Sequence, residues 1–387
     1  MTSIATSEAR TDGLAIRAPH RLFFLCGIAN AAVPLMTVML WLVVEAAWVA
    51  LLPFLWSFVT VPILDAIIGE DETNPPEDGI AALQQQRFYT WIVYAQIPVL
   101  LTSFVAGMWL LTHAALPIWA LIPFLYTLGV GSGHAIIVAH ELGHRTGRTD
   151  RMMAQIALGI VGYGHFCIEH NRGHHVRVAT PEDCSSARYG ETVYAFAWRD
   201  ITGALLGGWK EERRRLKARG HGFFSAKNEV LQSYALTVLA AALLVLWLGW
   251  AVLPFLLIHH VLAYFALSMV NYIEHYGLKR RKLPSGRYEP CQPKHSWNTN
   301  HAVSNILEIN LQRHSDHHAN PQRPYQCLRN FEELPRLPSG YPGCLSLSLI
   351  PPLWFAVMNP RVRDWAGGDF GLINTGPEDA RAPELVS

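Results

Sequence analysis

Residues 251–282 read AVLPFLLIHHVLAYFALSMVNYIEHYGLKRRK. The first part, 251–272, contains no Asp, Glu, Lys or Arg, and its length matches the roughly 20 apolar residues that a helix needs to cross a bilayer. The run ends in Glu274 and His275, and four basic residues follow at 279–282. This stretch predicts a membrane-spanning helix that ends in a potential metal ligand beside a positively charged flank.

Five more runs of similar length carry almost no charge, so the sequence predicts an all-α integral membrane protein with six transmembrane helices. The other five runs lie at 22–44, 47–68, 88–112, 116–139 and 230–250. The chain then divides into 1–20 (a disordered cytoplasmic N-terminus), 21–140 (four spans), 141–229 (cytoplasmic), 230–277 (two spans) and 278–387 (cytoplasmic), all in one fold unit. The apolar segment 341–357 is broken by Pro351-Pro352, which favours an interfacial position over a span.

The distribution of basic residues predicts the orientation. The short connections at 45–46, 113–115 and 250–251 contain no Lys or Arg, whereas all 31 basic residues lie in the termini and the other loops. Because cytoplasmic loops collect positive charge, we expect both termini and the two large polar segments on the cytoplasmic side.

Composition excludes several other classes of protein. Hydrophobic residues make up 51% of the chain and charged residues 16%, below the roughly 25% usual for soluble domains. The net charge of +1 gives no signature of nucleic-acid binding. Six cysteines form no C-x-x-C pair, which argues against a zinc knuckle, a rubredoxin-type iron site or a disulfide framework.

Eighteen histidines are unusual, and many of them occur in short motifs. The motif HELGH at 140–144 closes the fourth predicted span. Residues four apart share a helix face, so His140 and His144 can reach one metal ion. The same pattern is the signature of zinc metalloproteases, in which the glutamate acts as general base.

Three more motifs follow. EHNRGHH at 169–175 and LQRHSDHH at 311–318 each end in two adjacent histidines, and NYIEHYG at 271–277 adds one more. Adjacent histidines on a helix diverge by about 100°, so each pair can serve two different ions. The sequence therefore predicts a site for two metal ions with nine ligands: His140, His144, His170, His174, His175, His275, His314, His317 and His318.

Nine histidines exceed the needs of one zinc ion and fit two ions of higher coordination number. Imidazole alone does not choose among iron, copper, zinc and nickel. Carboxylates that accept the far N–H of a ligating histidine are the expected neighbours of such a site. The candidates, each within or shortly after a motif, are Glu141, Glu169, Asp183, Glu274 and Asp316.

Together these motifs resemble those of the membrane-bound alkane 1-monooxygenases. The resemblance extends through VATPED at 178–183, HSWN at 295–298, YPG at 341–343 and DWAGGD at 364–369, and so covers nearly the whole chain. The Glu-His-Tyr-Gly element at 274–277 distinguishes this family from the fatty acid desaturases, which share the general plan of histidine motifs.

The resemblance implies a non-haem diiron enzyme in the bacterial inner membrane. With two Fe ions and O₂ as co-substrate, it would hydroxylate the terminal methyl of medium-chain n-alkanes to primary alcohols. Electrons would come from NADH through rubredoxin reductase and rubredoxin. Since the chain has no C-x-x-C pair to build a fused rubredoxin domain, that donor would be a separate protein.

Other functions remain open at this level. A xylene monooxygenase or a fatty acid desaturase would use similar motifs, an intramembrane zinc protease would use 140–144 alone, and a transporter or metal sensor would not be an enzyme. Two basic segments, 213–219 and 279–282, could dock an acidic redox partner or could merely face anionic lipid. Bulky side chains in the first spans, Trp41, Trp56 and Phe58, are candidates for setting substrate chain length.

Overall fold

The computed structural model describes residues 18–377. Within that range every regular element is a helix, and β-type pairing is limited to isolated bridges such as the one between Glu70 and His301. The all-α prediction is therefore confirmed. The predicted disordered N-terminus, 1–20, lies outside the described residues except for 18–20, which begin helix α1.

The helices follow one another with short connections in the first half of the chain and longer loops in the second. The N-terminal half contains α1 (Ala18–Phe23), α2 (Leu25–Ala31), α3 (Val33–Val44), η2 (Ala47–Leu51), α4 (Leu52–Leu55), η3 (Trp56–Thr60), α5 (Val61–Ile68), η4 (Glu77–Gly79), α6 (Ile80–Gln84), α7 (Arg87–His113), α8 (Ile118–Ser132), α9 (His134–Gly143) and α10 (Arg148–Val161). The rest contains α11 (Phe166–Glu169), η5 (His170–His174), α12 (His175–Arg177), α13 (Val193–Ala218), α14 (Glu229–Leu248), α15 (Val252–His275), η6 (Pro293–His295), α16 (Ala302–Leu307), α17 (His314–Ala319), η7 (Tyr325–Cys327), α18 (Tyr341–Ser348), α19 (Pro351–Trp365) and η8 (Phe370–Leu372).

Five helical stretches of the described chain are long and apolar enough to cross a membrane, and each overlaps a predicted span. They are Ala47–Ile68, Arg87–His113, Ile118–Gly143, Glu229–Leu248 and Val252–His275. The remaining predicted span, 22–44, comprises the end of α1 with α2, followed by α3, and it bends by 55° between Ala31 and Val33. Length and composition thus allow five to seven spans, and the number six stays a prediction.

The second bent pair is α18 and α19, which meet at 119°. The break coincides with Pro351-Pro352, the first two residues of α19, where proline is compatible with a helix start but not with a continuing helix. The predicted interruption of the apolar segment 341–357 is therefore confirmed.

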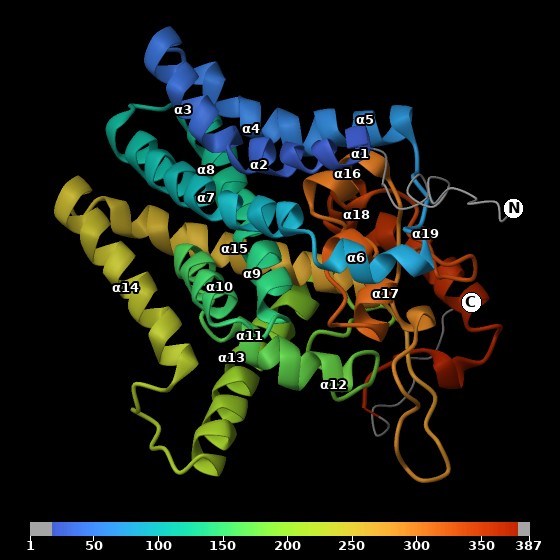
Figure 1. The fold of residues 1–387 in the computed structure, drawn as a ribbon. Helices are drawn as coiled ribbons and strands as arrows, with labels where there is room; N and C mark the ends of the chain where they lie inside the picture. Colours follow the sequence, from blue (N-terminus) through green and yellow to red (C-terminus); the bar gives the residue numbers. More distant parts are fainter. Residues whose placement is uncertain (1–17, 378–387) are drawn as a thin grey trace, which may run out of the picture.

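The central spans carry the site. Helices α7, α8 and α15 pack against one another, while α14 lies at the edge and leaves most of its apolar surface uncovered (Figure 1). Asn228 starts α14, because its side-chain oxygen accepts a hydrogen bond from the Leu231 backbone N–H at 3.0 Å. The uncovered apolar surface fits lipid as its surroundings.

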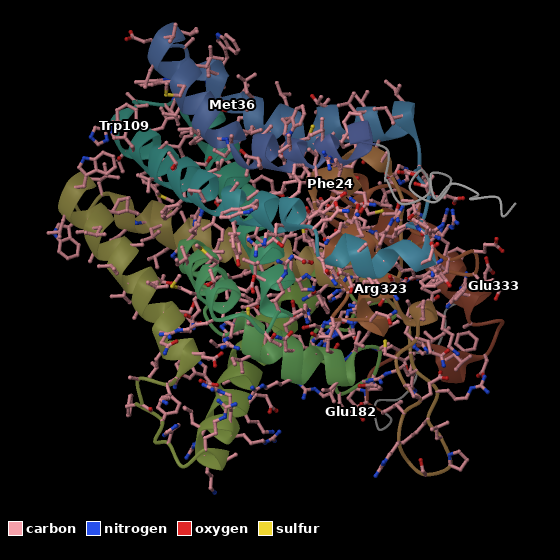
Figure 2. The ribbon with its side chains drawn as sticks, in the orientation of Figure 1. Phe24, Met36, Trp109, Glu182, Arg323 and Glu333 are labelled. Atoms are coloured by element: carbon pink, nitrogen blue, oxygen red, sulfur yellow. The ribbon has the colours of Figure 1, made fainter. Side chains whose placement is uncertain are left out.

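Polar side chains gather at one end of the bundle. Met36 and Trp109 lie at the apolar end, and Glu182, Arg323 and Glu333 lie at the other (Figure 2). Glu182 belongs to the loop between α12 and α13, and Arg323 and Glu333 belong to the loops between α17 and α18. A second apolar core at this polar end includes Tyr276 and Trp354, both fully buried. This core gives the loops near His275 a rigid base.

Candidate metal centre

Five of the predicted ligands form one group, largely buried, which we call the five-histidine cluster: His140, His144, His170, His175 and His317. One nitrogen atom from each lies within 4.8 Å of all the others. The contacts between Nε2 atoms are 2.9 Å for His140 and His317, 2.9 Å for His170 and His175, and 3.1 Å for His175 and His317.

The other four ligands form the four-histidine cluster: His174, His275, His314 and His318. Nε2 of His314 lies 3.2 Å from Nε2 of His275 and 2.9 Å from Nε2 of His318. All nine predicted histidines therefore come together, and they do so in two groups, as the doubled histidines indicated.

The division between the clusters differs from simple helical spacing. His170 and His174 are four residues apart but belong to different clusters, whereas His170 and His175, five apart, share one. The reason is that His170–His174 is a π-helical turn, in which hydrogen bonds join residues i and i+5. In α17, an ordinary α-helix, His314 and His318 four apart do share a cluster.

The arrangement of the imidazole nitrogens suits binding of metal ions better than hydrogen bonding between the rings. Nε2 of His144 and Nε2 of His174 are buried without a hydrogen-bond partner, and the remaining Nε2 atoms face other Nε2 atoms. Converging imidazoles cannot all satisfy each other, because a neutral ring has one donor and one acceptor. Nitrogens about 2.1 Å from one ion and at right angles to each other would be about 3.0 Å apart, close to the observed separations. The two clusters can therefore each hold a metal ion.

Electrostatics favour the form of histidine that binds metal. Burial lowers the pKa of His144 to about 4, and burial together with neighbouring imidazoles holds the pKa values of His170 and His175 well below the ordinary value. These rings are neutral near pH 7, which leaves a lone pair for an ion.

Two of the predicted carboxylates touch cluster histidines. Asp183 Oδ2 lies 2.9 Å from His174 Nδ1, the nitrogen that faces away from the cluster. Glu274 Oε2 instead lies 3.2 Å from His314 Nε2, on the cluster side, and its Oε1 accepts a hydrogen bond of 2.6 Å from the Tyr341 hydroxyl. Both carboxylates are buried and can offset positive charge on bound ions.

The other three predicted carboxylates pair with arginines. The separations are 2.7 Å for Glu141 with Arg145, 3.2 Å for Glu169 with Arg177 and 2.6 Å for Asp316 with Arg323. The pairing of Glu141 with Arg145 argues against the protease alternative, because a general base must face the water on the metal and not an arginine.

Two residues near the clusters were not among the predicted site residues. Ser296 Oγ lies 3.4 Å from His275 Nδ1, and Tyr341 reaches Glu274 from 67 residues away in sequence. The HSWN and YPG motifs contain these two residues, but spacing alone gives them no role. Four further histidines lie near the motifs without joining a cluster and bond to other groups: His134, His165, His295 and His301.

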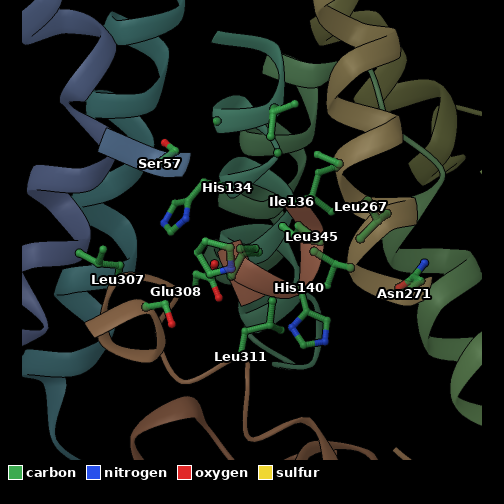
Figure 3. Close-up of a pocket in the computed structure, with 18 of the residues that line it drawn as sticks. Ser57, His134, Ile136, His140, Leu267, Asn271, Leu307, Glu308, Leu311 and Leu345 are labelled. Atoms are coloured by element: carbon green, nitrogen blue, oxygen red, sulfur yellow. The ribbon is translucent and has the colours of Figure 1, made fainter. Parts of the chain in front are cut away.

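An apolar cavity of about 150 Å³ reaches the clusters from between the helices. Its lining residues include His140, His314 and Glu274, and also Ser57 and Phe58 of η3. Ser57 and His140 lie on opposite sides of the cavity (Figure 3). Of the predicted chain-length residues only Phe58 lies in this wall. Trp56 donates a hydrogen bond to Asn30 at a smaller neighbouring cavity, and Trp41 packs edge-on against Trp109.

Fold and site together define a helical metalloprotein with room for two ions at the end of its candidate membrane spans. The fatty acid desaturase family model matches residues 117–345, more than half of the chain. Alkane 1-monooxygenase 1 of Alcanivorax borkumensis is 40% identical, covering 97% of this chain and 93% of the relative. The alkane 1-monooxygenase of Ectopseudomonas oleovorans is 44% identical, covering 86% and 84%.

A more distant relative is the xylene/toluene monooxygenase hydroxylase component XylM of Pseudomonas putida, 33% identical over 59% of this chain and 60% of the relative. Identity and coverage are both greater for the alkane 1-monooxygenases. The chain belongs to the alkane 1-monooxygenase family of oxidoreductases.

Proposed function

We propose that this protein hydroxylates the terminal methyl of medium-chain n-alkanes to primary alcohols, using O₂ and electrons from reduced rubredoxin. The observation that carries the proposal is the apolar cavity, whose lining includes His140 and His314, one from each histidine cluster. Family membership supports the same reaction.

The proposed cofactor is two iron ions held by all nine histidines. When bound, they supply the reduction of O₂ and the insertion of one oxygen atom, which no amino-acid side chain provides. The reaction balances as alkane plus O₂, two electrons and two protons giving alcohol plus water. Asp183, on the far nitrogen of His174, fixes that ring, and Glu274 adds negative charge beside His314.

The cavity walls bind and orient the substrate. Burial of an alkyl chain contributes about 0.8 kcal/mol per CH₂, and an alkane already dissolved in lipid enters between helices without crossing water. Apolar side chains from η3, α8 and α15 surround the alkyl chain, so the terminal methyl is the part of the substrate that reaches His140. The same walls keep bulk water from the reacting atoms.

We further propose that both termini and the metal centre face the cytoplasm of a bacterial inner membrane, with six spans. Support comes from the basic residues, which concentrate in the segments around the clusters. The segments 141–229 and 278–387 would then form one cytoplasmic unit closed over the ends of α9 and α15.

A surface hollow beside the four-histidine cluster is the proposed rubredoxin-docking surface. Lys279, Arg281 and Lys294 line it, with Glu289 as the one carboxylate among its lining residues. His295 also lines it and precedes Ser296, whose hydroxyl contacts His275. An electron donor seated here is therefore separated from a cluster histidine by very few residues.

The other basic segment is a weaker candidate. Arg215 is buried between Glu212 and Glu229 at 2.6 and 3.1 Å, and Arg214 pairs with Glu211 at 2.9 Å. This end of α13 lies at the bottom of the molecule, well away from α17 (Figure 1). Its remaining cations suit lipid headgroups better than an electron donor.

Reversing the charge of the hollow is expected to weaken rubredoxin-dependent turnover. In the triple variant Lys279→Glu, Arg281→Glu, Lys294→Glu, kcat/KM for rubredoxin should fall about 10-fold or more and lose its dependence on ionic strength, because steering by complementary charge is removed. Chemical reduction of the bound metal by dithionite should be unaffected.

The matched control reverses the same number of charges at the C-terminal end of α13 and at its C-cap with Arg213→Glu, Lys217→Glu, Arg219→Glu, and should leave kcat/KM for rubredoxin unchanged. Equal losses in both triple variants would contradict docking at the hollow. A wild-type rate that is flat with ionic strength would also contradict it.

The function itself is tested with purified protein in detergent or nanodiscs, supplied with octane, NADH, rubredoxin reductase and rubredoxin. We expect 1-octanol by gas chromatography and two iron ions per chain. An aryl alcohol from xylene or an alkene from an acyl substrate, with no alcohol from octane, would identify one of the related oxygenases instead. One zinc ion and no iron would revive the protease alternative.

A further inference from the structure

Two adjacent residues on α13, outside all histidine motifs, hold the loop that supports the four-histidine cluster. This loop, 183–186, carries Asp183, whose carboxylate contacts His174. Asp200 is 1% exposed and accepts a hydrogen bond of 2.6 Å from the hydroxyl of Ser185 in the middle of the loop. Asp200 is thus connected to a cluster histidine through Ser185 and Asp183.

The neighbouring Arg199 holds the backbone of the same loop. Its guanidinium donates to the carbonyl oxygens of Asp183, Cys184 and Ser186 at 3.4, 2.9 and 3.1 Å. An ion pair of 2.7 Å with Glu191 fixes the guanidinium in place. Because one rigid guanidinium group binds three carbonyl oxygens of the loop, the loop has little freedom to move.

Asp200 also connects this loop to α15. Its second oxygen accepts hydrogen bonds from Ser268 at 2.7 Å and from the Asn271 amide at 3.3 Å. Asn271 lies four residues before His275 on the same helix. One buried carboxylate therefore joins the support of His174 to the helix that ends in His275, and both histidines belong to the four-histidine cluster.

The packing of α13 against the loop is very close. A Cβ atom added at Gly203, one turn after Arg199, would lie 2.5 Å from the Cβ of Cys184. Glycine at this position lets the helix approach the loop closely enough for Arg199 and Asp200 to bind it.

We propose that Arg199 and Asp200 are positioning residues that set the metal affinity of the four-histidine cluster but not of the five-histidine cluster. This rests on the proposed function in so far as each cluster binds an ion. Neither residue touches a cluster histidine in the hydrogen bonds of the described chain, so their effect passes through Asp183 and α15. Partners of ligating histidines change metal affinity by roughly 10- to 100-fold, and we expect an effect of that order.

The test measures metal release from the intact purified protein, as anaerobic transfer of Fe(II) to a chromogenic chelator. The wild type should release iron in two phases, one per cluster. Asp200→Asn keeps the side-chain shape but removes the charge, and should speed one phase about 10- to 100-fold while leaving the other unchanged. Gly203→Ala, which displaces the loop without changing charge, should speed the same phase.

Arg214→Gln is the matched control, because it removes a charge from the same helix at an exposed ion pair, and both phases should stay unchanged. If Asp200→Asn does not fold, Ser185→Ala removes the hydroxyl that bonds to Asp200, together with its weak contact to Cys184, and should still speed the same phase. Unchanged release, or equal acceleration of both phases, would overturn the inference. A wild-type protein that binds no iron would instead contradict the proposed function.

Discussion

Replacing His314 with alanine is expected to abolish alkane hydroxylation and to reduce bound iron from two ions per chain to about one. His314 contacts both His275 and His318 through Nε2, so it stands at the centre of the four-histidine cluster. Its loss leaves three imidazoles and frees Glu274 from its contact with Nε2. Loss of a supporting residue alone typically costs 10- to 100-fold, so loss of a ligand should cost at least about 100-fold in activity.

His275→Ala should behave in the same way, because it removes another ligand of the same cluster. His144→Ala provides an informative comparison, since the five-histidine cluster would keep four imidazoles and should retain more of its iron. The measurements are iron per chain by mass spectrometry and 1-octanol formation by gas chromatography.

His301→Ala is the control for this series. His301 lies outside both clusters and bonds to Thr299 at 2.7 Å, so the variant should keep both iron ions. Full activity in His275→Ala or His314→Ala would disprove the assignment of nine ligands.

The second large effect concerns substrate length. Ser57 and Phe58 are neighbours in the wall of the cavity, and Figure 3 shows Ser57 on the side opposite His140. Ser57→Trp should shorten the space and abolish turnover of the longest alkanes, while Phe58→Ala should extend it and admit longer ones. Each methylene that no longer fits, or newly fits, is worth about 1–3 kcal/mol in discrimination.

The measurement is kcat/KM for a series of n-alkanes, supplied singly and in competition. Trp41→Ala is the control, because Trp41 packs against Trp109 and does not line the cavity, so its profile should match the wild type. An unchanged chain-length profile in both Ser57→Trp and Phe58→Ala would show that this cavity does not hold the alkyl chain.

Much of the fold could be predicted, because a bilayer imposes a length and a composition on every helix that crosses it. Five of the six predicted spans correspond to long helices with ends within a few residues of the prediction. The first was less predictable. The 55° bend at Ala32 was not predicted, although Pro34, the second residue of α3, lies beside it at a helix start, where proline is tolerated.

The supporting residues of the site were harder to predict than the histidines. A carboxylate beside a motif is equally able to contact a ligating histidine or to pair with an arginine. Here Asp183 contacts a histidine, whereas three others pair with arginines: Glu141, Glu169 and Asp316. Asp200, Ser296 and Tyr341 come from segments whose positions depend on how the loops fold back over α15. No spacing rule connects such distant residues.

The sequence by itself predicted a helical membrane protein and nine histidines as the ligands of two ions, because hydropathy and doubled histidines are local properties of the chain; the structure brings these nine histidines together in two clusters. Only the tertiary structure decided which histidine joins which cluster. The π-helical turn at His170–His174 shifts the shared face from four residues to five, and thereby divides His174 from His170. The end of α15 illustrates both contributions. The motif at 271–277 predicted a ligand at His275, but the place of His275 in the four-histidine cluster depends on α13, α17 and the loops packed around it.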